Sequence, residues 1–584
     1  MNASLLTLAE QSDFRQTGRL DEVEALSEAF AARWPDAVHS FVYGRSGEDR
    51  AMRALLVSRT GARTPQALRQ KGIPLLMLQG GIHPGESDGK DAGFIALREL
   101  LSAPTPNLLE QIAVLFVPAF NADGHERVGR WNRPNQNGPE ITGWRTNSQN
   151  VNLNRDYTKA TQVEMHAMLR LIDAWDPLIC ADLHVTDGAD FEPDISLQVE
   201  PINQGEPGLR DSGVAMRDRL IEKLAAQGSL PLAFYPDFAR TDDPASGFVL
   251  TVYSPRFSTG YFPQRNRYSV LVETHSWKPY EHRVRITRNT IVGLAELTAA
   301  HGRDWLRQAQ QADVAASRLG GSEVVLDYMS GWREPLKAGG AVRELGDEGA
   351  RRIDFRGYAY TRERSAISGS FATAYDPKTP QIWNVPYRDR IEAKLTVTAP
   401  AGGYVVPPGY AEMMQEKLAL HGIESRVLGA PAEGVAVQVY RAERVEFSDS
   451  PFEGCQRVTL AGQWHDEVQP IAAGSLLVPV AQRLARLVLA MLEPEAPDSL
   501  AAWGFFNACF EQKEQVEGYV AEQIAREMLA ADAGLRKEFE QAVARDPQFA
   551  ANPTARLEFF LRRHPSWDVR FNLYPIYRLP RVLT

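Results

Sequence analysis

An alternation of short apolar runs with amphipathic segments constrains the fold of this chain more than any other feature. Runs of strand length lie within residues 73–81, 112–124, 177–188 and 268–276, and residues 160–175 have the period of an amphipathic helix. Strands that alternate with helices predict an α/β domain with a largely parallel sheet. The polar residues of these runs gather at their C-terminal ends, where open α/β sheets bind ligands.

The rest of the sequence has a different texture. Residues 320–398 carry alternating apolar and polar runs, interrupted by glycines, that are typical of strands. The patterns of residues 409–423 and 517–544 predict helices. We therefore expect a catalytic domain over residues 1–310, a β-rich accessory region over 311–450 and a mainly helical C-terminal region over 451–584.

Composition limits the classes of partner. The chain has 584 residues and a formal net charge of -10, which argues against nucleic acid or an anionic membrane as its main partner. No apolar run approaches the roughly 20 residues that span a bilayer, and the N-terminal residues lack the pattern of a signal peptide. We expect a cytoplasmic protein, or a periplasmic or secreted one if a signal peptide has been removed. The oligomeric state stays open, a homo-oligomer included.

The segment GGIHPGESDG at residues 80–89 places a histidine and a glutamate three positions apart across a proline and a glycine. Because proline and glycine disfavour a helix there, His83 and Glu86 are expected on a bend between a strand and a helix that Asp88 caps. Imidazole nitrogen and carboxylate oxygen are zinc ligands, and His184, at the end of another apolar run, is the best third ligand. The alternative is a turn with an incidental histidine.

Two further segments carry polar side chains suited to catalysis. GWRTNSQNVNLNRDY, residues 143–157, contains Arg145, Asn154 and Arg155, and an arginine fork with an asparagine amide matches a carboxylate. A solvated asparagine-rich turn is the alternative. Glu273 directly follows apolar strand residues, and a partly desolvated glutamate beside zinc suits a general base.

Together, His83-Pro84-Gly85-Glu86, His184, the NLNRD segment and Glu273 resemble the zinc metallocarboxypeptidase (funnelin) family, over roughly residues 50–300. The resemblance implies a mixed, mostly parallel eight-stranded sheet flanked by helices, with one zinc per chain at the carboxyl ends of the strands. It also implies a peptide substrate with a free C-terminal carboxylate.

The resemblance further implies a role for each matching residue. Asn154 and Arg155 would hold the substrate carboxylate, Arg145 would polarise the scissile carbonyl, and Glu273 would activate the zinc-bound water. Tyr253 and Tyr261 are both candidates for the family's mobile substrate-binding tyrosine.

The sequence departs from the family at one position and suggests a substrate preference at others. Where many relatives have an aspartate that orients the first histidine ligand, this chain has Asn152, whose amide oxygen accepts a hydrogen bond without carrying charge. Arg256, Arg265 and Arg267 raise the hypothesis of an acidic terminal side chain, with pairing to surface carboxylates as the favoured alternative.

Three functions remain in competition at the level of sequence. The leading hypothesis is a zinc carboxypeptidase that hydrolyses the C-terminal peptide bond of a peptide. The second is a zinc amidohydrolase that acts on N-acyl amino acids with the same ligands. The third is a non-catalytic binding protein that uses the accessory half. Zinc content and a mixed substrate panel would separate them.

Overall fold

The core of the protein is an eight-stranded mixed sheet of order β1-β2-β4-β3-β5-β9-β6-β7. It is seen in a computed structural model that describes residues 5–330 and 350–583. The strands are β1 (Val38–Arg45), β2 (Ala51–Val57), β3 (Leu75–Gly80), β4 (Ala113–Val117), β5 (Ile179–Val185), β6 (Ile195–Glu200), β7 (Pro231–Leu232) and β9 (Tyr268–Thr274). The central strands β4, β3, β5 and β9 run parallel. β1 and β2 pair antiparallel with their neighbours, and β6 pairs antiparallel with β9 and parallel with β7. The predicted fold class is confirmed.

Helices cover both faces of this sheet because its central strands are apolar on both sides. They are α1 (Leu8–Gln11), α2 (Leu20–Arg33), α3 (Pro65–Lys71), α4 (Asp88–Ser102), α5 (Ala122–Glu126), α6 (Val163–Trp175), α7 (Arg210–Ala226), α8 (Ser258–Gln264) and α9 (Tyr280–Ala316). Leu76 and Leu78 pack with α2, α4, α7 and α9 on one face, and Met77 packs with α6 on the other. Short 3-10 turns are η1 (Leu108–Glu110), η2 (Leu153–Arg155), η3 (Pro207–Leu209), η4 (Pro244–Ser246) and η5 (Asn507–Phe510). Asp88 does not cap α4, since its carboxylate accepts from Arg283 and Thr274 instead.

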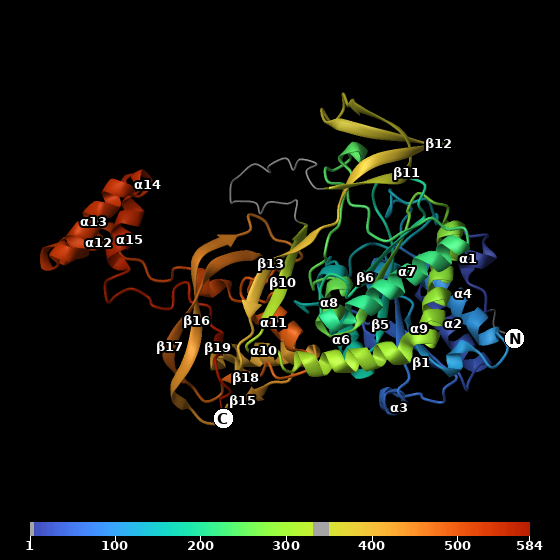
Figure 1. Ribbon diagram of the computed structural model, residues 1–584, viewed down its shortest axis with the longest axis horizontal. Helices are drawn as coiled ribbons and strands as arrows, with labels where there is room; N and C mark the ends of the chain where they lie inside the picture. The colour runs from blue at the N-terminus through green and yellow to red at the C-terminus, as the bar shows by residue number, and fades with distance from the viewer. Residues whose placement is uncertain (1–4, 331–349, 584) are drawn as a thin grey trace.

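Two β-structures follow the eight-stranded sheet. β10 (Glu323–Ser330) pairs with β13 (Ile391–Thr398), and β11 (Arg351–Arg364) forms a long hairpin with β12 (Phe371–Arg388). The base of β12 pairs with β8 (Phe248–Val249) of the first region, where aromatic side chains from both regions form a small core. Figure 1 shows the hairpin extending along one edge of the molecule.

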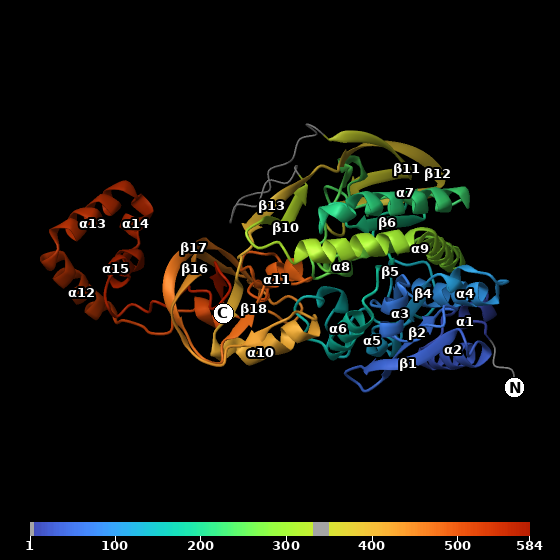
Figure 2. The same ribbon diagram turned by 60° about the horizontal axis from the view of Figure 1, so that its bottom comes forward.

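A six-stranded sheet of order β15-β18-β14-β19-β16-β17 lies beyond it. Its strands are β14 (Gly403–Val406), β15 (Arg426–Val427), β16 (Ala432–Phe447), β17 (Val458–Ile471), β18 (Leu476–Val478) and β19 (Tyr577–Leu579). The helices of this half are α10 (Pro408–Leu420), α11 (Ala485–Leu492), α12 (Gly518–Ala531), α13 (Ala533–Arg545), α14 (Pro547–Ala551) and α15 (Pro553–Leu561). In Figures 1 and 2, α12 to α15 form a separate group at the end of the molecule farthest from the eight-stranded sheet.

The expected boundary at residue 450 falls inside the β16–β17 hairpin, so the division into regions stays a proposal. Among the described helices, none combines the length and the apolar character needed to cross a membrane.

Candidate active site

The three expected metal ligands meet at the carboxyl ends of two adjacent parallel strands. His83 and Glu86 lie on the bend between β3 and α4, and His184 lies near the end of β5, which pairs with β3. The Glu86 carboxylate sits between the histidines, with Oε1 3.0 Å from Nδ1 of His83 and Oε2 2.8 Å from Nδ1 of His184. One donor atom from each residue lies within 4.8 Å of the others, and all three side chains are buried.

The bend depends on the two glycines before it. Gly81 has a φ of 66°, in the left-handed region that side chains disfavour, and a Cβ on Gly80 would lie 2.8 Å from the carbonyl oxygen of Pro118. Any larger residue would push the chain away from β4. The close approach therefore brings His83 over the end of the sheet.

The Nε2 atom of each histidine, which points away from Glu86, faces a polar partner. Nε2 of His83 lies 3.0 Å from Oδ1 of Asn152, and Nε2 of His184 lies 3.1 Å from Oδ2 of Asp182. An amide oxygen only accepts, so Nε2 of His83 carries the proton and Nδ1 keeps its lone pair for a metal. Asp182 was missed in the sequence; its position two residues before His184, on the same side of β5, is the signal that could have found it.

Electrostatics suit His83 and Glu86 to cation binding. At His184 burial opposes the charge, yet Asp182 and Glu86 raise the pKa of the imidazole well above its usual range. Burial lowers the pKa of His83 to about 4, which keeps the imidazole neutral. Burial opposes ionisation of Glu86, yet His83 and Arg133 hold its pKa well below the usual range. A neutral imidazole and an ionised carboxylate are the forms that bind zinc. The donor set therefore fits the ion that the sequence predicted.

Asn154 and Arg155 come from η2 and line the same cavity as the three expected ligands. The guanidinium carbon of Arg155 lies 4.2 Å from the centre of the Phe257 ring. Within residues 5–330 and 350–583 no carboxylate forms an ion pair with Arg155. Burial, with Arg145 and Arg256 nearby, lowers the pKa of Arg155 to about 10. Arg145 points toward the ligands, with a guanidinium nitrogen 3.4 Å from Oε1 of Glu86.

Glu273 lies opposite His184 in the β5–β9 register. Its side chain is buried, and in the described part of the chain Oε2 has no hydrogen-bond partner. Burial raises the pKa of Glu273 to about 8, although His184 acts in the opposite direction. A carboxyl group with a pKa near neutrality can both accept and release a proton.

These side chains line one cavity of about 260 Å³. Its lining is His83, Glu86, Arg145, Asn154, Arg155, His184, Val185, Asp187, Tyr235, Asp237, Tyr253, Phe257, Thr259, Leu271 and Glu273. Of the two tyrosine candidates only Tyr253 belongs to it. Tyr261 is fully buried in α8, where its hydroxyl lies 2.9 Å from Nδ1 of His421, so the structure does not bring it to the cavity. Tyr235 and Asp237 were missed because their segment has no regular period.

The three arginines that suggested an acidic terminal side chain have carboxylate partners. Arg256 pairs with Asp498, Arg265 with Asp173, and Arg267 with both Asp176 and Asp313. Arg265 and Arg267 are buried rather than at the surface. Their partners favour a structural role for all three.

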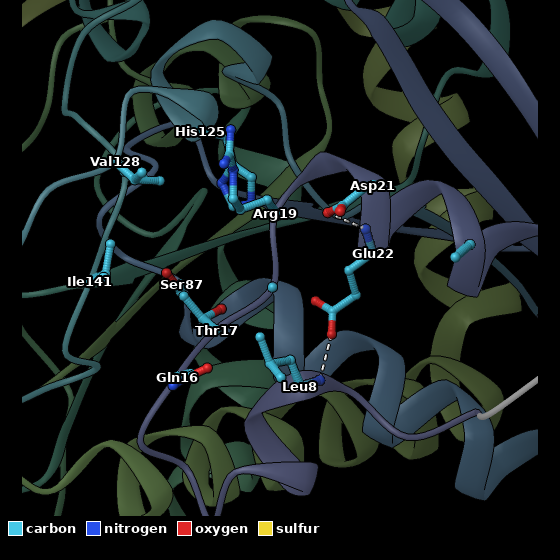
Figure 3. Close-up of a pocket in the computed structure, with 13 residues that line it drawn as sticks. Leu8, Gln16, Thr17, Arg19, Asp21, Glu22, Ser87, His125, Val128 and Ile141 are labelled. Atoms are coloured by element: carbon cyan, nitrogen blue, oxygen red, sulfur yellow. Dashed lines mark hydrogen bonds between the residues drawn. The ribbon is translucent and has the colours of Figure 1, made fainter.

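A larger cavity of about 570 Å³ is lined largely by the N-terminal segment, together with Ser87 directly after the bend (Figure 3). Its lining includes Leu8, Arg19, Glu22, Ser87 and His125, and Figure 3 shows these side chains arranged around it. None of the three expected metal ligands lines it. Those three residues line the smaller cavity instead.

Comparison with known proteins agrees with the geometry. Residues 23–187 match the family model described as zinc carboxypeptidase. Two fungal proteins named Carboxypeptidase 2, from Trichophyton equinum and Trichophyton tonsurans, are each 23% identical over 451 residues, covering 73% of this chain and 73% of the relative. These matches confirm the resemblance and the expectation of a zinc metallopeptidase.

Solved structures with some likeness include a putative carboxypeptidase A from Shewanella denitrificans, at 15% identity and a TM-score of 0.36, covering 47% of this chain and 69% of that one. A metallo-carboxypeptidase from Burkholderia cenocepacia has 16% identity and a TM-score of 0.36, covering 48% of this chain and 69% of that one. A likeness at this level has no bearing on function.

Proposed function

We propose that this protein, whose residues 23–187 match the zinc carboxypeptidase family, hydrolyses the C-terminal peptide bond of a peptide. One observation carries the proposal. A single cavity combines the His83, Glu86 and His184 donors with the buried Glu273 carboxyl and the Arg155 guanidinium.

Substrate binding would use the cationic end of the cavity. The Arg155 fork can form two parallel hydrogen bonds with a terminal carboxylate, and the Asn154 amide can add another. An internal peptide bond offers no such charge. Binding through this end would therefore restrict cleavage to the last residue of a chain.

His83, Glu86 and His184 would hold one zinc ion, leaving a coordination position open. Zinc in such a site lowers the pKa of a water molecule to about 7 and polarises a carbonyl. Glu273 would accept a proton from the attacking water and deliver it to the leaving amine. Arg145 would stabilise the negative charge that develops on the carbonyl oxygen.

An N-acyl amino acid also has a free carboxylate, so the same arginine could bind the substrate of an amidohydrolase. A non-catalytic binding protein would have no use for a buried carboxyl beside the metal donors. The amidohydrolase would differ from the carboxypeptidase only in the acyl part of its substrate. Assays with both classes of substrate therefore decide between them.

The test is zinc content together with hydrolysis of a panel of peptides and N-acyl amino acids. We expect about one zinc per chain in the wild type, in Glu273→Gln and in the exposed control Glu281→Gln. Only Glu273→Gln should lose release of C-terminal residues, by about 10²- to 10⁴-fold. Cleavage of acyl amino acids alone would replace the peptidase with the amidohydrolase. No zinc under metal-replete conditions would refute both.

A further inference from the structure

A loop of the accessory half, residues 311–584, contacts the residue that precedes the turn carrying Asn154 and Arg155. The connection between β16 and β17 carries Glu453, whose Oε2 accepts a hydrogen bond from the backbone N–H of Asn152 at 2.8 Å. The two residues are 301 positions apart in the sequence. Asn152 immediately precedes η2, the turn that carries Asn154 and Arg155.

The loop holds Glu453 in an unfavourable backbone conformation. Phe452 and Cys455 exchange backbone hydrogen bonds of 2.8 and 3.1 Å around a two-residue turn. Glu453 has a φ of 50° and Gly454 a φ of 76°, so both lie in the left-handed region. Glycine, asparagine and aspartate suit such a turn, whereas glutamate does not. Strain of this kind persists where the surrounding structure imposes it, and it often marks a functional position.

Arg256 of the catalytic domain makes further contacts near the Phe452–Cys455 turn. The Arg256 guanidinium lies 5.8 Å from the centre of the Phe452 ring, and the Arg256 backbone N–H donates to Asp498 at 2.9 Å. Phe452 also stacks on Trp503, with ring centres 6.1 Å apart. Phe452 therefore ties the turn both to Arg256 of the catalytic domain and to Trp503.

Asn152 links the Glu453 contact to the site, because its side chain contacts both the η2 turn and His83. Its Oδ1 accepts from the backbone N–H of Asn154 at 3.0 Å and lies 3.0 Å from Nε2 of His83. The Glu453 carboxylate also adds a negative charge near Arg155 and opposes the lowering of the Arg155 pKa by burial. One accessory side chain thus supports both the carboxylate-binding turn and a metal donor.

We propose that Glu453 is a positioning residue of the active site, which fixes the Asn152–Arg155 turn and so presents Asn154 and Arg155 to the carboxylate of the substrate. The inference rests on the proposed function. It also gives the accessory half a role, because without the β16–β17 loop the turn would lose its outer support.

Two substitutions of Glu453 separate positioning from folding. Glu453→Asn suits the left-handed turn, yet its side chain is too short to reach Asn152. We expect KM for a peptide substrate to rise about tenfold, the size of one lost hydrogen bond to a charged group, with kcat little changed and Tm equal or higher. Glu453→Gln keeps an acceptor oxygen at the same reach and should stay within about threefold of wild type. Asp449→Asn, the same change of charge at an exposed position of the same loop, should leave KM unchanged.

Amide hydrogen exchange over residues 152–155 gives a readout that needs no activity. In the full-length metal-free protein we expect exchange of these amides to be about tenfold faster in Glu453→Asn than in wild type, with Asp449→Asn unchanged. An unchanged exchange rate, or an unchanged KM in Glu453→Asn, would overturn the inference. Because exchange is measured without substrate, loss of the peptidase hypothesis would leave this test intact.

Discussion

Nε2 of His83 lies 3.0 Å from Oδ1 of Asn152, so a neutral amide orients the first of the proposed metal ligands. A hydrogen-bonded partner of this kind fixes the ring of a histidine ligand and raises its basicity, and a carboxylate does so more strongly than an amide. The corresponding partner of His184 is a carboxylate, because its Nε2 lies 3.1 Å from Oδ2 of Asp182. The two donors therefore differ in strength although their geometry is similar.

Asn152→Asp should tighten zinc binding. The substitution keeps an oxygen beside His83 and adds a negative charge, so we expect zinc affinity to rise by up to about tenfold, within the range known for partners of ligating histidines. Competition with a chromophoric chelator measures the affinity. Asn150→Asp, on the preceding turn, is the matched control and should change it little. An unchanged affinity in Asn152→Asp would mean that charge on the orienting partner has no influence here.

Arg145→Ala should reduce turnover more than binding. Its guanidinium reaches the donor end of the cavity, 3.4 Å from Oε1 of Glu86, where a carbonyl oxygen would gain negative charge. Loss of such a donor lowers kcat by about 10²- to 10³-fold, with a smaller change in KM. Steady-state kinetics on a dipeptide series would separate the two. A rise in KM with kcat unchanged would instead assign Arg145 to ground-state binding.

The sequence was sufficient to predict the sheet and the residues at its strand ends. Apolar runs indicate strands, and parallel strands bring their carboxyl ends to one edge, so the sequence alone places His83 and His184 close together. Contacts that depend on tertiary packing had no such signal. Glu453 lies in an irregular turn far along the chain, and its contact with Asn152 exists only because the two halves dock.

Tyr261 illustrates a second limit. Both candidate tyrosines lie before Glu273 in the same segment, and sequence position could not separate them. The structure distinguishes them by depth, because α8 turns Tyr261 into the core against Tyr157, with ring centres 5.2 Å apart, whereas Tyr253 stays at the cavity. Composition near a site does not report the direction in which a side chain points.

Arg267→Ala should destabilise the protein. The guanidinium is buried and bonded to Asp176 and Asp313, so its removal takes this cation from both carboxylates, and Asp176 keeps an ion pair with Arg483 at 3.8 Å. Breaking a buried pair in this way costs about 3–5 kcal/mol, and urea unfolding measures it. Arg307→Ala removes an exposed pair with Asp304 and should cost less than about 1 kcal/mol. Equal effects of the two substitutions would contradict the structural role assigned to Arg267.

The stability of the protein should fall in acid through His421. Burial and the nearby Arg265 and Lys417 lower the pKa of His421 to about 3, against an ordinary value of 6.5. Between those pH values the unfolded chain binds a proton that the folded protein does not. The free energy of unfolding therefore decreases as the pH falls below about 6.5, by up to about 1.4 kcal/mol per pH unit for this residue. Urea unfolding between about pH 7.5 and pH 5 should show a shallower dependence in His421→Gln, whereas the exposed control His465→Gln should keep the wild-type slope. If both variants keep that slope, other groups cause the loss in acid, and the contact between His421 and Tyr261 carries no pH dependence.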